Sequence, residues 1–518
     1  MPITPTYPGI YIEELPSNSH PITAAPTSVT VFVGYTHPFQ TDPANWNQAV
    51  EIFSFSDYQN QFGGLYTSGV FESHVAYAVS QFFLNGGAVA YVVALPPSYY
   101  DSSGDNKGLA SQSPPAVQVG VVTFTGLQPV DIVSMTVTIN NIQSVTNPND
   151  TADVSISYGP KAETYRKVNL GATTDPNFIA NRINGVSQLV TVAATSGSSF
   201  TPVGQASLVY PPSIEPDWTT FSVDDFTQVF AQDSSLDKLA IFNLLLVPGV
   251  ADTTVWSEAL SFCERKLAFV IMDPPVQDTA DGFGENLPTI YNDFQGPIIP
   301  KSTNGALYFP YLQCGDPLTG NTFPLPPSGS VAGLYATTDN NRGVWKAPAG
   351  LQTIVQNTIG AVDTGEMTDA RQGTLNLIGV DCLRDFPGIG TVIWGARTLV
   401  TENTAFAQWE YVPVRRMALF LEQTLRANLT WVVFEPNDTP LWVAIRTSIE
   451  SFMLTLFQQG AFQGNTPSDA FQVLCDSTTT TQADIDLGIV NILVAFAPLK
   501  PAEFVVIQIA QLAGQSSS

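Results

Sequence analysis

The sequence carries little charge, and very little of it is positive. Only 12% of its 518 residues are charged, and 45 acidic residues outnumber 19 basic ones, which gives a formal net charge of −26. The first basic residue is Lys107. Binding to nucleic acid or to an anionic membrane needs a concentrated positive surface, and no run of basic residues provides one. We therefore expect neither nucleic acid nor direct membrane insertion among its partners.

Histidine and cysteine are also scarce, which limits catalysis and metal binding. The four cysteines lie far apart and form no CxxC pair, so we expect buried free thiols and no zinc site. A Ser–His–Asp triad needs a positioned base, and none of the three histidines has a suitable context. The histidines are His20, His37 and His74, and the cysteines are Cys263, Cys314, Cys382 and Cys475.

Long apolar runs are absent from the sequence as well. No stretch approaches 18 apolar residues, so we expect no membrane-spanning helix. The first residues lack the basic region and apolar core of a signal peptide, which favours a reducing cytoplasm. No P-loop pattern is present, and Gly388-Ile389-Gly390 lacks the third glycine of a dinucleotide-binding loop. We therefore expect no cofactor.

The sequence does contain enough apolar residues to fold into several domains. A chain of 518 residues exceeds what one core supports, so roughly two to four domains are expected. A β-branched run at Ser28–Tyr35 is followed by helical stretches at 56–62 and 70–84 and by a strand pattern at 88–95. This alternation resumes over 241–272, and it favours an α/β domain.

Residues 98–221 interrupt the α/β pattern. Pro96-Pro97 opens this stretch and Pro211-Pro212 closes it. In between, polar and apolar residues alternate in runs such as VSMTVTI at 133–139 and DVSISY at 153–158, a pattern typical of strands buried on one face. We predict an inserted, mostly β domain.

The last 120 residues have the most regular pattern. Apolar residues at a four-residue spacing predict a helix from Pro413 to Val433. Thr439-Pro440 predicts the start of a second helix, which ends at Gly460, and Thr466-Pro467 starts a short third one. Strand patterns follow at 471–475, 490–497 and 503–512.

Both ends of the chain carry short strand patterns next to proline-containing segments. An unpaired strand is able to add to the sheet of another molecule, because its backbone N–H and C=O groups are free. The same strands would also fit into a sheet of their own chain. The residue pattern by itself leaves both alternatives open.

Motifs along most of the chain resemble the contractile tail sheath family of phages, R-type bacteriocins and extracellular contractile injection systems. The resemblance excludes residues 98–221, and His20 stands where the family has a basic residue. The motifs include PGIYIEE at 8–14, TSVTVFVGYT at 27–36, FFLNGG at 82–87, LLLVPGV at 244–250, FVIMDPP at 269–275, PPSGSVAGLYATTDNNRGVWKAPAG at 326–350, LNLIGVDCLRDFPGIGTVIWGARTL at 375–399, FEPND at 434–438, AFQVLCD at 470–476 and APLKPAEFVVIQI at 497–509.

The resemblance implies a multidomain protein of mixed α/β and α+β class. It implies an N-terminal arm at 1–26, a middle subtilisin-like α/β domain at 27–97 and 222–394, an outer β-rich domain at 98–221, and an inner domain at 395–518 that the terminal arms complete. The N-terminal and C-terminal arms would link neighbouring subunits by strand exchange. The arm residues are Tyr7, Ile10, Tyr11, Ile12, Glu503, Phe504, Val505, Val506, Ile507 and Ile509.

The resemblance also implies a structural role and a set of partners. Copies of the chain would stack as hexameric rings around an inner tube, assemble in the bacterial cytoplasm, and meet a baseplate and a tail terminator or cap. Basic residues of the inner domain are candidates for tube contact, although ordinary pairing within the chain is an alternative. These residues are Arg415, Arg416, Arg426 and Arg446, and Arg342 and Lys346 are candidates for subunit contact.

Two other functions are alternatives to a sheath. A protease would use the serines of Ser328-Gly329-Ser330, but none of the three histidines lies in a sequence context that suits a catalytic base. A β-rich capsid- or adhesin-like shell protein would share the acidic, threonine-rich composition. The order of the motifs and the helical stretch at 413–460 favour the sheath over the shell protein.

Overall fold

The computed structural model describes most of the chain as two compact units. Unit 1 comprises Met1–Pro26, Arg342–Ala347 and Pro413–Ser518, and unit 2 comprises Thr27–Asn341 and Pro348–Val412. The described residues are 20–37, 40–66, 74–96, 98, 100, 102–105, 115–127, 134–144, 146–158, 161–200, 204–209, 219–275, 299–362, 367–400 and 404–508.

The boundary between the units differs from the domain boundary expected at residue 395. Residues 395–412 belong to unit 2. The reason is backbone pairing, since the N–H of Leu399 donates to the carbonyl of Gly305 at 3.1 Å and the N–H of Val412 donates to that of Ala396 at 3.0 Å. The change at residues 26–27 coincides with the end of the expected N-terminal arm.

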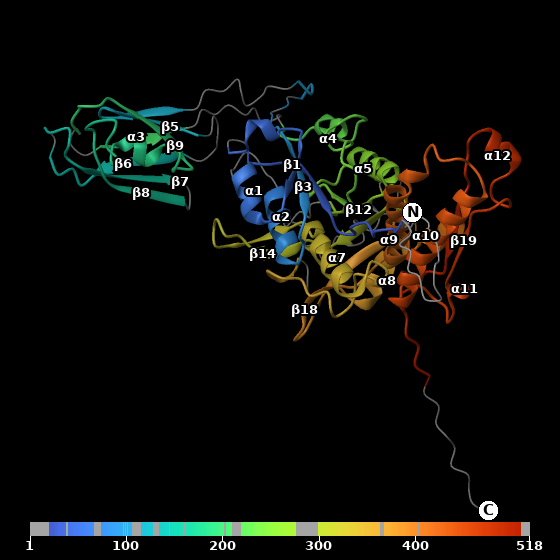
Figure 1. Ribbon diagram of the computed structural model, residues 1–518. Coiled ribbons are helices and arrows are strands. Elements are labelled where there is room, and N and C mark those ends of the chain that lie inside the picture. Colours follow the sequence, from blue (N-terminus) through green and yellow to red (C-terminus); the bar gives the residue numbers. More distant parts are fainter. Residues whose placement is uncertain are drawn as a thin grey trace, which may run out of the picture. The chain divides into compact units, whose positions relative to one another are not determined.

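A mixed sheet of eight strands forms the centre of unit 2 (Figure 1). Its strands are β1 (Thr30–Tyr35), β2 (Ala49–Ile52), β3 (Ala90–Leu95), β11 (Leu244–Leu246), β12 (Phe269–Met272), β13 (Gly305–Phe309), β17 (Val380–Phe386) and β18 (Gly390–Ile393). Their order is β18-β17-β13-β12-β11-β1-β3-β2. The strands from β17 to β3 are parallel, and β18 and β2 pair antiparallel at the two edges. Parallel strands are covered on both faces, which explains the continuous apolar runs in the sequence.

Helices and a small antiparallel sheet surround this central sheet. Trp256, Phe262 and Cys263 of one helix are buried in the core formed with β1, β11 and β12. The other strands and the helices of unit 2 outside the insertion are β14 (Leu312–Gly315), β15 (Thr322–Leu325), β16 (Thr358–Ala361), η1 (Pro43–Asn45), α1 (Phe55–Phe62), α2 (Val75–Leu84), α4 (Val223–Val229), α5 (Thr253–Lys266), α7 (Ser328–Arg342), α8 (Asp369–Leu377) and η4 (Thr404–Trp409).

Helices α2 and α7 approach each other through glycine. A Cβ atom at Gly329 would lie 2.3 Å from the carbonyl oxygen of Ala78, and one at Gly333 would lie 2.6 Å from that of Phe82. These distances are too short for any side chain, so the two backbones are in direct contact. The hydroxyl of Thr337 donates to the carbonyl of Asn85 at 2.7 Å one turn further along. Gly329 and Gly333 of the family-like motif at 326–350 are therefore packing residues.

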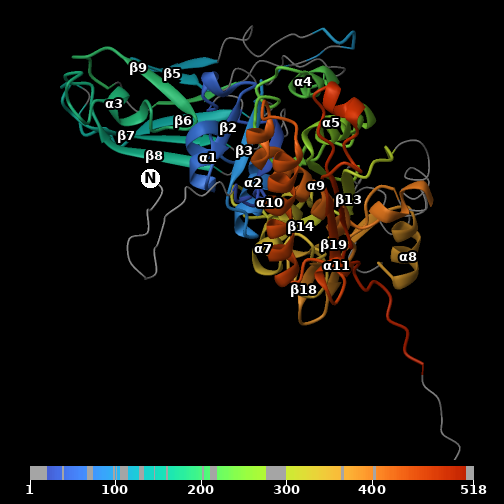
Figure 2. The same cartoon turned by 45° about the vertical axis from the view of Figure 1, so that its right-hand side comes forward.

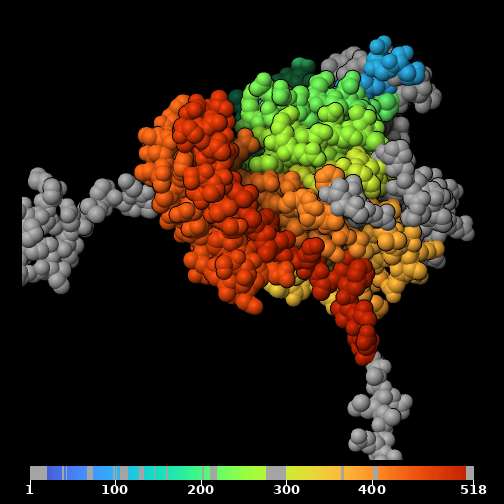
Figure 3. All heavy atoms as spheres, turned by 90° about the vertical axis from the view of Figure 1, so that its right-hand side faces the viewer, coloured from blue at the N-terminus to red at the C-terminus, as the bar shows by residue number. Residues whose placement is uncertain are grey.

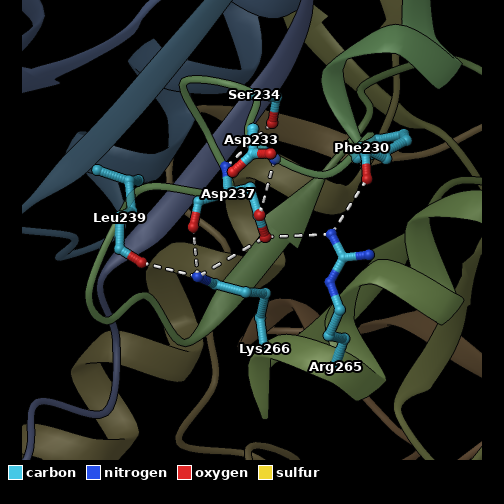
Figure 4. Close-up of polar contacts among 7 residues, drawn as sticks. All are labelled: Phe230, Asp233, Ser234, Asp237, Leu239, Arg265 and Lys266. Atoms are coloured by element: carbon cyan, nitrogen blue, oxygen red, sulfur yellow. Dashed lines mark hydrogen bonds and ion pairs between the residues drawn. The ribbon is translucent and has the colours of Figure 1, made fainter.

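A cluster of polar contacts fixes the C-terminal end of α5 to the loop that precedes β11 (Figure 4). The Lys266 ammonium donates to the carbonyls of Asp237 and Leu239 at 2.7 and 2.9 Å. The Arg265 guanidinium donates to the Asp237 carboxylate at 3.1 Å and to the carbonyl of Phe230 at 3.3 Å. These basic side chains satisfy loop carbonyls and align the loop with the start of β11.

The alternating runs at 133–139 and 153–158 are strands, as predicted, and they belong to an insertion that has two small sheets and a hydrophobic cluster of its own. One sheet has the order β4-β5-β9 and the other β10-β6-β7-β8, and their inward residues form a separate hydrophobic cluster. Its elements are β4 (Ala116–Val119), β5 (Val122–Gly126), β6 (Met135–Asn140), β7 (Ala152–Tyr158), β8 (Lys161–Val168), α3 (Ile179–Ile183), β9 (Val190–Ala194) and β10 (Gly204–Leu208).

A short bridge holds together the two chain segments at the base of the insertion. The N–H groups of Tyr100 and Thr219 donate to each other's carbonyls, both at 2.8 Å. The Asp225 carboxylate accepts from the hydroxyls of Tyr100 and Tyr35, with shortest distances of 2.7 and 2.8 Å. The entry and exit of the insertion are thus tied to β1 and to α4.

Unit 1 is built on two long helices and a hairpin-like pair of strands. Residues of both helices share one hydrophobic cluster with Val344, Phe462 and Val473. The helices predicted from the spacing of apolar residues are present, within a few residues of the expected ends. The elements are α9 (Val412–Asn428), η5 (Thr430–Val432), α10 (Thr439–Gln458), α11 (Pro467–Ala470), β19 (Phe471–Leu474), α12 (Gln482–Asp486) and β20 (Leu493–Phe496).

Because α2 and α7 are in direct contact, adding one methyl group at this contact should strongly lower the stability of the subunit. Gly329→Ala forces a Cβ against the Ala78 carbonyl, so we expect the free energy of unfolding to fall by about 2 kcal/mol or more. The control is Gly373→Ala in α8, where a Cβ would meet nothing within 4 Å. Because alanine favours helix, the control should be neutral or up to about 1 kcal/mol more stable. Chemical unfolding of the subunit measures both, and equal stabilities would contradict the contact.

Candidate assembly surfaces

The described C-terminal segment leaves unit 1 as an exposed apolar strip. Ala497 is held to the body by hydrogen bonds from its N–H to the carbonyl of Ala470 and from the Gln463 N–H to its own carbonyl, at 2.8 and 2.9 Å, and Pro498 bridges to Phe462. The chain then projects in extended form (Figures 1 and 3). The four apolar side chains from Phe504 to Ile507 are 73% to 82% exposed. Four consecutive apolar residues in water mark an interaction segment, because an isolated chain gains nothing from exposing them.

Half of the residues expected in the two arms lie within the described residues. Glu503, Phe504, Val505, Val506 and Ile507 lie in this projecting segment, and within residues 20–508 as described no named strand contains them. The strand pattern at 503–512 is therefore not paired with a sheet of its own chain over the described part. The arm residues Tyr7, Ile10, Tyr11, Ile12 and Ile509 lie outside the described residues.

The sheet next to the C-terminal segment has two strands in the described part of unit 1. β19 pairs antiparallel with β20, from Phe471 opposite Phe496 to Leu474 opposite Leu493. Leu493 is 51% exposed, whereas Val473 is buried. A two-stranded sheet is marginal by itself, and an unpaired edge accepts a further strand. This sheet is therefore a suitable acceptor for an extended arm.

The arginines of α9 and α10 differ in how accessible they are. Arg415 pairs with Glu422 at 3.5 Å and Arg446 with Glu450 at 3.9 Å, while Arg426 is exposed near the end of α9. Burial raises the pKa of Glu422 and the charge of Arg415 opposes this rise. Arg416 is only 3% exposed. A guanidinium that is buried in the subunit does not reach a partner, so Arg416 is better explained as a structural residue. Arg426 and Arg446 keep accessible surface.

Arg342 and Lys346 lie where the chain passes briefly through unit 1. Arg342 is exposed at the end of α7, and the Lys346 ammonium donates to the carbonyl of Ala347 at 2.8 Å. Burial and the charge of Arg342 lower the pKa of Lys346. Val344 is buried in the unit 1 core. The two cations therefore differ in their accessibility to a partner, since Arg342 is exposed and Lys346 is half-buried.

The two candidate protease nucleophiles, Ser328 and Ser330, are buried where α7 packs against its neighbours. Ser328 and Ser330 are both 0% exposed, and the Ser330 hydroxyl lies 3.4 Å from the Gln81 amide oxygen. The Ser328 N–H and hydroxyl donate to the Asp273 carboxylate at 2.8 and 2.6 Å. Asp273 at the carboxyl end of β12 thus fixes the start of α7. The sequence pattern does not reveal the link between Ser328 and Asp273, because the two residues are 55 positions apart.

The described residues contain no group that suits a metal and no helix that could cross a membrane. Across those residues, no set of three or more His, Cys, Asp or Glu side chains could hold a metal ion. Likewise, no helix among them is long and apolar enough to span a bilayer. All four cysteines are free thiols and buried.

Two family models match consecutive parts of the chain. One, described as the phage tail sheath protein central domain, matches residues 233–399, and the other, described as the phage tail sheath C-terminal domain, matches residues 404–511. Together they cover more than half of the 518 residues.

Curated relatives share about a quarter of the aligned residues with this chain. The tail sheath protein of Vibrio phage KVP40 is 26% identical over 179 residues, which are 35% of this chain and 25% of the relative. A putative prophage major tail sheath protein of Pseudomonas aeruginosa (strain UCBPP-PA14) is 26% identical over 282 residues, 52% of this chain and 65% of the relative. The chain thus spans less than two thirds of the length of these relatives.

Solved structures match over almost the whole chain and share its fold. The contracted helical sheath of the anti-feeding prophage (AFP) has a TM-score of 0.58 at 22% identity and covers 98% of this chain and 100% of its own. The PVC sheath complex of an extracellular contractile injection system, also contracted, has a TM-score of 0.56 at 22% identity, with 98% of both chains covered. A chain of the AFP baseplate structure has a TM-score of 0.58 at 22% identity, with 98% of this chain and 99% of that one covered.

These matches and the fold define a sheath-type subunit with a mixed α/β, multidomain architecture. The chain belongs to the phage tail sheath family. The curated relatives described above are named as tail sheath proteins.

The buried Asp273 predicts a specific dependence of stability on pH. Burial raises the pKa of this carboxyl from 3.8 to about 6, against hydrogen bonds from Ser328 and Gly249 that lower it. A raised pKa means that the folded chain holds the proton more tightly, so this contribution to stability is complete below pH 3.8 and is lost as the pH rises through 6. The loss amounts to about 3 kcal/mol.

Comparison with Asp273→Asn isolates this titration. The stability advantage of the natural chain over the variant should shrink by about 3 kcal/mol between pH 4 and pH 7, because only the natural side chain ionises. Urea unfolding at several pH values measures the difference. A difference that stays constant with pH would show that the carboxyl does not titrate in this range.

Proposed function

We propose that this chain polymerises around an inner tube as stacked hexameric rings and contracts to drive that tube through a target envelope. The observation that carries the proposal is the projecting apolar segment at 504–507 next to a two-stranded sheet with room for further strands. Similar chains form a helical sheath in AFP and a sheath complex in an injection system. A structural role without catalysis follows, and unit 2 would correspond to the subtilisin-like middle domain.

The arms would connect neighbouring copies by adding strands to the β19–β20 sheet. Burying four apolar side chains contributes about 1.5 to 3 kcal/mol each before the cost of ordering the segment. Main-chain hydrogen bonds survive rotation of the rigid bodies, provided that the connecting chain bends. Pro498 and Pro501 lie between β20 and the arm, and the chain that contains them would be the connection that bends. The N-terminal residues Tyr7–Glu14 would form the second arm.

Contraction needs only a small energy difference for each subunit. Moving a two-state equilibrium from 1:99 to 99:1 requires about 5.5 kcal/mol, which is about 1 kcal/mol per subunit in a ring of six. Two packings of the same rigid units can differ by that amount without a cofactor. The inner tube, the baseplate and a terminator or cap protein are the partners of this cycle, and assembly would take place in the bacterial cytoplasm.

Removing an arm should abolish cohesion without unfolding the subunit. Deletion of residues 503–518 removes the exposed segment at 504–507, and none of these four described residues belongs to the cores of unit 1 or unit 2. We expect an unchanged thermal midpoint and no cohesive tubes in negative-stain electron microscopy. Deletion of residues 1–14 should behave alike. The matched control lacks only residues 513–518 and should form normal tubes. Normal contractile tubes from either arm deletion would refute the linking role of that arm.

The accessible arginines of α9 and α10 would meet acidic groups of the inner tube. Arg426→Glu together with Arg446→Glu should reduce co-sedimentation with purified tubes at least tenfold, because opposite charges become like charges. Self-assembly should persist. Arg166→Glu, an exposed arginine of the insertion, serves as the control and should change neither. Unchanged tube binding by the double variant would assign these arginines to pairing within the chain.

A further inference from the structure

Phe434 combines two unfavourable features at the surface of unit 1. Its side chain is 103% exposed, and its backbone φ is +72°. The left-handed region costs a bulky L-residue roughly 1 to 2 kcal/mol. A fully exposed aromatic ring gains nothing from burial that would offset this cost. Val433 beside it is 63% exposed. Backbone strain that folding does not reward is characteristic of a functional position.

The loop that carries Phe434 is held firmly on both sides. The N–H of Glu435 donates to the carbonyl of Val432 at 3.2 Å. The Trp442 indole donates to the side-chain oxygen of Asn437 at 2.8 Å, and Asp438 caps α10 through the N–H of Leu441 at 3.1 Å. Trp442 is buried in the core of unit 1. The ring is therefore presented by a fixed turn, which lowers the entropy lost on binding.

A second loop extends the apolar surface. Leu487 and Ile489, which follow α12, are 75% and 42% exposed. The side-chain amide of Asn437 donates to the carbonyl of Ile489 at 2.9 Å and joins the two loops. Val433, Phe434, Leu487 and Ile489 are named the two-loop ridge below.

The two chain segments that carry the two-loop ridge are acidic. Hydrogen bonds from Thr478 lower the pKa of Asp476, and Arg446 of α10 lies close enough to lower it further. Residues 427–445 and 476–499 contain no Lys or Arg. A surface that complements the two-loop ridge must supply apolar contact at its centre and positive charge at its border. The acidic residues of these two stretches are Glu435, Asp438, Asp476, Asp484 and Asp486.

We propose that the two-loop ridge is a docking contact for a second copy of this chain. The inference deepens the proposed function and rests on it. Figures 1 and 2 both show α12 at one end of unit 1 and the C-terminal segment leaving from the other. A subunit with different contacts at its two ends associates head to tail, which generates rings and helices. The second copy also carries Arg342, which is exposed. Its guanidinium is a cation that suits the acidic border of the ridge.

Replacing the strained phenylalanine separates docking from folding. Phe434→Gly removes the ring and relieves the left-handed strain, so the thermal midpoint of the unassembled subunit should stay equal or rise. The critical concentration for polymerisation, measured by sedimentation of the full chain, should rise at least tenfold. Glu435→Lys should raise it as well. Phe53→Ala removes another exposed aromatic ring, on unit 2 and 61% exposed, and should leave it unchanged.

A photo-crosslinker identifies what covers the two-loop ridge. p-Benzoylphenylalanine at position 434 of the polymerised chain should give covalent dimers whose crosslinked peptides come from two copies. Crosslinks confined to one copy, an unchanged critical concentration for Phe434→Gly, or a lower thermal midpoint of that variant would each overturn the docking role. If the natural chain fails to polymerise, the proposed function falls first. If it polymerises and Phe434→Gly polymerises equally well, only the docking contact falls.

Discussion

The direct backbone contact between α2 and α7 is the constraint on which the rest of unit 2 depends. Gly329 and Gly333 allow the two helices to touch, so the first turn of α7 reaches the Asp273 carboxylate at the end of β12. That carboxylate holds the start of the helix with two hydrogen bonds from Ser328 and also accepts the N–H of Gly249 at 3.0 Å. A site that resembles a ligand-binding position of α/β enzymes is thereby filled by the protein itself.

Local patterns predicted several of the regular elements of the fold. The buried run at Ser28–Tyr35 is β1, and the four-residue spacing after Pro413 is α9. The alternating runs at 133–139 and 153–158 are the strands β6 and β7. In each case one face or one continuous segment is buried, so the periodicity of the residues reports the structure directly.

The sequence did not predict the features that depend on contacts between residues far apart in the chain. The role of α7 rests on small residues that meet α2, and small residues give no apolar periodicity. Residues 395–412 look like the start of the inner domain but pair with Gly305 in unit 2. Arg416 was one of four candidates for tube contact, with pairing inside the chain as the alternative, and the sequence does not reveal that it is only 3% exposed, because a helix position does not show which neighbours cover it. The segment at 504–507 differs from Arg416 in the opposite direction. Its apolar pattern is typical of a buried strand, but its side chains are exposed and no named strand of the described chain pairs with it.

The paired ends of the insertion have a practical consequence for particle engineering. Tyr100 and Thr219 exchange two backbone hydrogen bonds, so their Cα atoms are about as close as neighbouring residues on paired strands. Domains whose termini lie side by side can replace one another at such a junction without stretching the host fold. The core of the insertion shares no residue with that of the central sheet. Foreign cargo or targeting modules grafted between these two residues would be repeated once for every copy of the subunit, giving a dense, regularly spaced display.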